Sequence, residues 1–109
     1  MITVAEIEKT VDYLRDNARK AAQARAERIY LEEYRKTVKA LLMREVASES
    51  LGGQEARAYA DKRYTTHLEA LRSAVERDEY HRWMMIAAQA KIEAWRTQSA
   101  TERALGKLG

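Results

Sequence analysis

The residues best suited to metal chemistry are two histidines and the acidic side chains near them. Asp78 lies three residues before His81, which would place both on one helix face, as in one carboxylate-x-x-histidine arm of a di-iron bundle. Such a site needs a second arm, and His67 has no carboxylate three residues before it. We therefore expect no metal site, and a solvated polar patch at 78–81 instead.

Groups for catalysis or cofactor binding are equally sparse. Cysteine is absent, so the chain offers no thiolate nucleophile and no disulfide. The adjacent carboxylates of Glu32 and Glu33 would diverge on a helix, and the pair at 52–53 (Gly-Gly) is too short to cradle a phosphate. Met84 and Met85 stand at helical spacing, which is typical of core or interface residues and not of a haem or flavin site. The sequence thus predicts a protein that is not an enzyme and holds no cofactor.

Basic side chains are concentrated in two segments of the chain. Residues 15–44 hold nine Lys and Arg against four Asp and Glu, whereas residues 46–80 hold five against seven and residues 81–109 five against two. A basic helix face could contact DNA phosphates or an acidic partner, with salt-dependent affinity. The candidate residues are Arg15, Arg19, Arg25, Arg28, Arg35 and Lys39. Glu32 stands between Arg28 and Arg35, so a solvated, salt-bridged face is the alternative, and we expect the tyrosines near the seams, not exposed for base stacking.

The elements that must position these residues are helices. The chain has 34% charged residues, no proline, four glycines and many alanines, a composition typical of long helices. Thr3 and Glu6 fit a capping box, the Gly-Gly pair is the clearest turn signal, and Asp61 is a plausible N-cap. We predict one domain, 1–109, that is all-α: an antiparallel hairpin with a helix at 3–49, a turn at 50–53, a short helix at 54–60, a helix at 62–104 and a frayed tail at 105–109. A single helix from 54 to 104 is the alternative.

The stretch "RWMMIAAQAKIEAWR" at 82–96 has two apolar faces on a helical wheel. A helix in a two-helix hairpin needs one apolar stripe, so the second face requires another partner. The simplest partner is a second copy, which would give a homodimeric four-helix bundle. The predicted oligomer or partner face comprises Trp83, Met84, Met85, Ala88, Ile92 and Trp95.

The sequence also indicates a cytoplasmic location. No stretch approaches 18 consecutive apolar residues, and the first residues lack the basic and apolar regions of a secretory signal. We therefore expect no membrane association.

The stretches "YLEEYRKTVKALLM" (30–43), "QEARAYA" (54–60) and "WMMIAAQAKIEAWRTQSATERA" (83–104) resemble a group of small all-helical proteins of tailed phages and prophages, encoded near recombination genes. The resemblance implies no functional residue, but it implies a phage accessory protein in the bacterial cytoplasm. The first functional hypothesis is binding in DNA recombination or replication through the basic face. The alternatives are an inhibitor that docks on a host nuclease or defence protein through an apolar helix face, and a structural scaffold.

Overall fold

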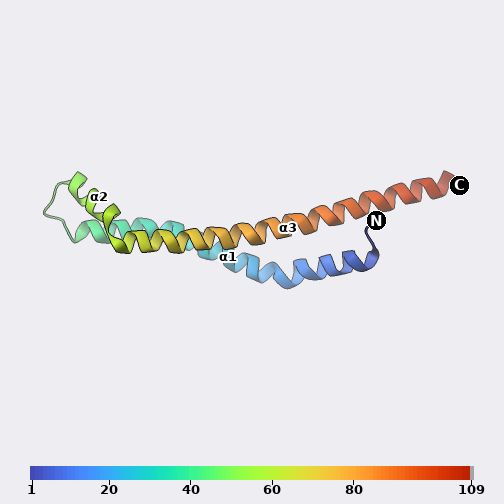
Figure 1. Ribbon diagram of the computed structural model, residues 1–109, viewed down its shortest axis with the longest axis horizontal. Helices are drawn as coiled ribbons and strands as arrows, with labels where there is room; N and C mark the ends of the chain where they lie inside the picture. The colour runs from blue at the N-terminus through green and yellow to red at the C-terminus, as the bar shows by residue number, and fades with distance from the viewer. Residues whose placement is uncertain (109) are drawn as a thin grey trace. The chain divides into compact units, whose positions relative to one another are not determined.

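The computed structural model describes residues 1–108, which form three helices (Figure 1). They are α1 (Val4–Arg44), α2 (Leu51–Ala60) and α3 (Lys62–Leu108). No strand occurs among these residues, which confirms the all-α prediction.

The capping box predicted at the start of α1 is confirmed. The backbone N–H of Thr3 donates to Glu6 Oε2 at 2.7 Å, and the N–H of Glu6 donates to Thr3 Oγ1 at 3.2 Å. These two bonds satisfy donors that the first helical turn leaves free, and they fix where α1 begins.

The turn between α1 and α2 lies earlier than the sequence indicated. The helix ends at Arg44 instead of residue 49, and residues 45–50 form the turn. Ser50 caps α2 by accepting a hydrogen bond from the N–H of Gly53 at 3.1 Å, so Gly52 and Gly53 belong to the first turn of α2. A helix cap is a stronger local signal than a glycine pair, because glycine costs a helix only about 1 kcal/mol.

Asp61 separates α2 from α3, which decides between one helix and two over residues 54–104. Its backbone is extended, with φ −69° and ψ 136°. Its carboxylate accepts from the N–H of Arg63 at 2.8 Å, as expected for the predicted N-cap. At its other end α3 continues to Leu108, four residues beyond the predicted end, because Gly106 alone does not stop the helix.

The helices group into two compact units, and the single domain predicted over 1–109 stays a prediction. Unit 1 contains Met1–Ala21 and the α3 residues 80–108, and unit 2 is Ala22–Glu79. In unit 1 the two segments run antiparallel. Gln98 exchanges two hydrogen bonds with the backbone of Ile2, at 3.1 and 2.9 Å, while Tyr13 and Met84 line one groove further along.

Unit 2 is an antiparallel hairpin with a small core. Leu42, Ala58 and Tyr64 form its buried cluster, and Val38 and Met43 pack against it. Ala24 and Ala74 are also buried. Within residues 1–108 no large side chain is fully buried, so the apolar area that stabilises the chain is limited.

Candidate interaction surfaces

Arg28, a candidate residue of the basic face, lies in an ion-pair network between α1 and α3 of unit 2. Its Nε donates to Glu32 at 2.9 Å, and its Nη1 donates to Asp78 at 3.1 Å and to Glu79 at 3.2 Å. The hydrogen bonds that Arg28 donates to Glu32 and Asp78 raise the pKa of its guanidinium above the ordinary value. Arg28 therefore links α1 to α3. Three carboxylates already surround its guanidinium, so it is poorly suited to bind a phosphate.

Lys39 has a similar role near α2. Its Nζ lies 3.4 Å from Glu55 Oε1 and 4.8 Å from the ring centroid of Tyr59. The Tyr59 side chain, and then Glu55, raise the pKa of Lys39. The Lys39 side chain is 29% exposed, so its ammonium mainly ties α1 to α2.

The other four candidate residues of the basic face are exposed. Arg15 pairs with Asp12 at 3.0 Å and with Asp16 at 3.3 Å, so neighbouring acids neutralise part of its charge. Within the described 108 residues, Arg19, Arg25 and Arg35 make no ion pair that meets a 4.0 Å limit. The six candidates are thus not equivalent, and these three cations remain available to a partner.

The prediction that the tyrosines are not exposed is wrong for most of them. Tyr30 and Tyr80 are each 60% exposed, and Tyr59 is 48% exposed. Tyr30 stacks on Tyr34, with ring centroids 5.7 Å apart and an interplanar angle of 11°. The i, i+4 spacing of this pair on α1 was the available signal for stacking, and Tyr64 is the tyrosine that is buried.

The histidines and Asp78 have structural partners of their own. Asp78 is 7% exposed and its carboxylate accepts from Arg28, while His67 Nε2 lies 2.8 Å from the backbone oxygen of Leu31. His81 Nδ1 is buried without a hydrogen-bond partner. Among residues 1–108 no group of three His, Cys, Asp or Glu side chains is placed to hold a metal ion.

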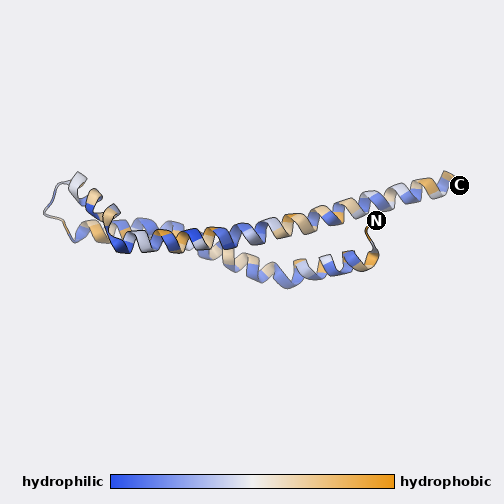
Figure 2. Ribbon diagram, in the orientation of Figure 1, coloured by the Kyte–Doolittle hydropathy of each residue, from blue (hydrophilic) through white to orange (hydrophobic). Residues whose placement is uncertain are grey.

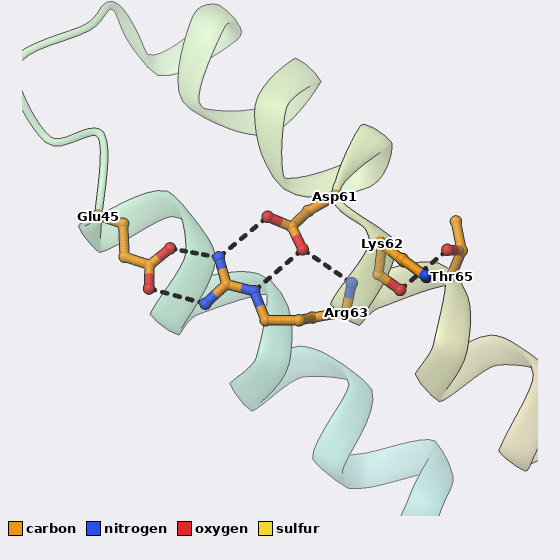
Figure 3. A network of polar contacts seen from close by, with 5 residues as sticks. All are labelled: Glu45, Asp61, Lys62, Arg63 and Thr65. Atoms are coloured by element: carbon orange, nitrogen blue, oxygen red, sulfur yellow. Dashed lines mark hydrogen bonds and ion pairs between the residues drawn. The ribbon is translucent and has the colours of Figure 1, made fainter.

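A second polar network fixes the junction of α1, α2 and α3 in unit 2 (Figure 3). The Arg63 guanidinium donates to both oxygens of Glu45, at 2.9 and 2.6 Å, and to Asp61 at 3.0 Å. These hydrogen bonds lower the pKa values of Glu45 and Asp61. A groove of about 570 Å³ lies beside the network, lined by Leu41, His67 and neighbouring residues.

The residues of the predicted partner face of α3 do not lie on one side in the structure: some are buried or half-buried, and others are exposed. Ala88 is 9% exposed and lines a groove of about 310 Å³ with α1 residues of unit 1, including Thr10 and Tyr13. Met85, Ile92 and Trp95 are half-buried, while Met84 is 38% and Trp83 59% exposed. The side of α3 that carries Ala88 therefore faces α1 of the same unit, and Trp83 belongs to the uncovered side.

The uncovered side of α3 forms a continuous stripe that we call the outer seam. Its positions alternate in steps of three and four residues, the spacing of a coiled-coil seam. It comprises Tyr80, Trp83, Ala87, Ala90, Ala94, Thr97, Thr101, Ala104 and Leu108, all of them exposed, although Ala87 also lines the groove shared with α1. Figure 2 shows that hydrophobic positions recur along α3 up to its C-terminal end. The sequence interpretation missed the part after residue 95 because alanine and threonine are weak signals of a seam.

Comparison of the chain with protein-family models, with curated proteins and with solved structures finds no match. No helix of the described chain is long and apolar enough to cross a membrane.

Proposed function

We propose that this chain is a non-enzymatic binding protein that works as a self-associated helical assembly, most simply a homodimer. The observation that carries the proposal is the outer seam, which keeps coiled-coil spacing from residue 80 to residue 108 while every position on it is exposed. A helix whose seam faces water has an apolar face without a partner, and such a face marks a protein interaction site.

The small size of the core supports this assignment. The chain leaves large side chains uncovered, among them Trp83 at 59%, Leu105 at 63% and Leu108 at 85% exposure. Removing such side chains from water contributes about 25 cal/mol for each Å² of apolar surface, which offsets part of the entropy cost of association. Self-association would add apolar burial that the separate chain lacks, and two-fold pairing is the commonest solution.

Sedimentation equilibrium of the intact chain tests self-association. We expect a mass near twice 12.6 kDa at about 100 µM protein. The variant Ala94→Glu places a charge on the outer seam and should shift the chain to monomer, with helix content unchanged by circular dichroism. Gln89→Glu adds the same charge on an exposed position away from the seam and should leave the dimer intact. A wild-type monomer at this concentration contradicts the proposal.

DNA binding in phage recombination or replication is the second candidate. Its support within unit 2 is the pair of exposed cations without ion pairs, Arg25 and Arg35, together with the exposed stacked ring of Tyr30. Aromatic rings and arginines together bind single strands by stacking and by phosphate contact. The resemblance to tailed-phage proteins supports the same role inside a bacterial cell.

A gel shift with a labelled single-stranded oligonucleotide tests this candidate. We expect a shift at about 50 mM salt that is lost near 200 mM. Arg25→Gln should weaken it, whereas Arg15→Gln, which removes a cation already paired with Asp12 and Asp16, should weaken it less. No shift at low salt excludes DNA as the partner.

A further inference from the structure

The side chains that flank the outer seam of α3 carry charge in an asymmetric pattern. One edge of the seam bears Glu79, Ile86, Glu93, Ala100 and Lys107, each seven residues after the last. The other edge bears Met84, Lys91, Gln98 and Leu105. In a pair of coiled helices these edge positions set the orientation and register of the partner.

We propose that two copies of this chain pair tail to tail, with residues 90–108 of their α3 helices antiparallel and Glu93 of each copy facing Lys107 of the other. This inference rests on the proposed self-association and adds its orientation and register. An antiparallel pair brings like edges together, so the edge with Glu93 meets its own copy. In the register that joins Glu93 to Lys107, two-fold symmetry makes the ion pair twice.

Two other arrangements of the same seam are less complementary in charge. A parallel, in-register pair places Glu93 near Gln98 and Ile86 near Lys91, so it forms no ion pair at these edges. An antiparallel pair that overlaps over the whole of 80–104 places Glu93 on Glu93 and Lys91 on Lys91, and the Glu79 that it brings to Lys107 is already paired with Arg28 at 3.2 Å. Like charges at such short range oppose pairing, so charge selects the tail-to-tail register.

The contacts across the seam are also compatible with this register. It places Ala94 opposite Ala104, Thr97 opposite Thr101, and Leu108 opposite Ala90. Small residues let the helices approach closely, and each large residue meets a small one. The hydroxyl of Thr97 donates to the Glu93 carbonyl at 3.2 Å, and that of Thr101 to the Thr97 carbonyl at 3.0 Å. The interface would therefore bury no unpaired hydroxyl hydrogen.

The tail of α3 is free to make this contact. Each residue from 100 to 108 is exposed, so the rest of unit 1 does not cover the tail. The Glu93 carboxylate accepts a hydrogen bond from Arg96 Nη1 on Oε1 at 3.0 Å, which leaves its other oxygen for Lys107 of the second copy. Lys107 is exposed and makes no ion pair within the described residues.

Charge reversal tests the register. Glu93→Lys and Lys107→Glu should each raise the dimer dissociation constant about tenfold, because each turns two attractions into two repulsions. A mixture of the two variants should form a heterodimer as tight as the wild type, since each 93 then faces an opposite charge at 107. The control Glu102→Lys lies outside the seam and both edges, and it should leave the dissociation constant unchanged.

Disulfide trapping tests the orientation, because the wild-type chain has no cysteine. Ala94→Cys and Ala104→Cys chains should cross-link to one another when mixed and oxidised, and neither should cross-link alone. Cross-linking of Ala94→Cys alone would establish a parallel pair and overturn this inference while leaving self-association intact. A dimer whose dissociation constant is unchanged by both charge reversals would overturn the register. A wild-type monomer would overturn the proposed function itself.

Discussion

Arg28 of α1 and Asp78 of α3 are 50 residues apart in the sequence and joined by a 3.1 Å ion pair that leaves the Asp78 side chain 10% exposed. A carboxylate with so little access to water needs its partner to replace the hydrogen bonds that water no longer makes. Arg28 therefore links the two helices of the hairpin in unit 2, although the basic residues near it in the sequence suggested a DNA-binding face.

Removal of that partner should destabilise the chain. Arg28→Met leaves Asp78 without its cation, so we expect a clearly lower melting temperature by circular dichroism. Arg35→Met, an exposed residue of the same helix, should change the free energy of unfolding by less than about 0.5 kcal/mol. Equal melting temperatures for the two variants would show that the Arg28 network contributes nothing to stability.

The two glycines of α2 offer a test of where the turn lies. A Cβ added at Gly52 meets no atom within 4 Å, and no glycine of the described chain has a positive φ. Gly52→Ala should therefore raise the free energy of unfolding by about 0.5 kcal/mol in urea titration, because alanine restricts the unfolded chain. At Gly53 the added carbon would lie 3.2 Å from Glu49 and Ser50, so Gly53→Ala should gain less. A loss of stability in Gly52→Ala would place the turn at the glycines after all.

The cap of α2 gives a prediction of its own. Ser50→Ala removes the acceptor for the N–H of Gly53 and should lower the free energy of unfolding by about 1 kcal/mol. Ser48→Ala, an exposed serine two residues earlier in the turn, should have little effect in the same urea titration. If both variants unfold alike, Ser50 does not cap the helix.

The network around Arg63 predicts a pH dependence. Arg63 lowers the pKa values of Glu45 and Asp61 from ordinary values of 4.5 and 3.8. A carboxylate whose pKa is lowered by folding contributes stability above its unfolded pKa, and that stability is lost as the pH falls through the folded value. Melting temperatures of the wild type and Arg63→Gln should thus differ at neutral pH and converge below about pH 4.

Arg72→Gln provides the control for that titration. Arg72 lies 3.9 Å from Glu69 with both side chains well exposed, so this variant should follow the wild type at every pH. A constant gap between the wild type and Arg63→Gln down to pH 3 would rule out the carboxylates as its cause.

Local signals in the sequence predicted the starts of α1 and α3 well. Thr3 with Glu6, and Asp61, were recognised because a cap depends on residues within one turn. The glycine pair alone misplaces the turn, because Ser50 caps the helix that contains both glycines. Each of these outcomes depended on residues that are close together in the chain.

Contacts between helices could not be predicted in the same way. Arg28 meets Asp78, and Lys39 meets Glu55, through the packing of separate helices, so neither pair is visible from spacing along one helix. The division of the 83–95 stretch was foreseen, but which side faces α1 follows from the groove that contains Ala88 and Thr10. The exposure of Tyr30 and Tyr80 also required knowledge of that packing.

The most direct test of the central claim is the mass in solution of the wild type beside that of Ala94→Glu, by sedimentation equilibrium at rising concentration. The outer seam predicts that the wild type approaches twice 12.6 kDa, and that Ala94→Glu stays at 12.6 kDa with the same helix content. A wild type that remains at 12.6 kDa up to about 100 µM would contradict self-association through α3.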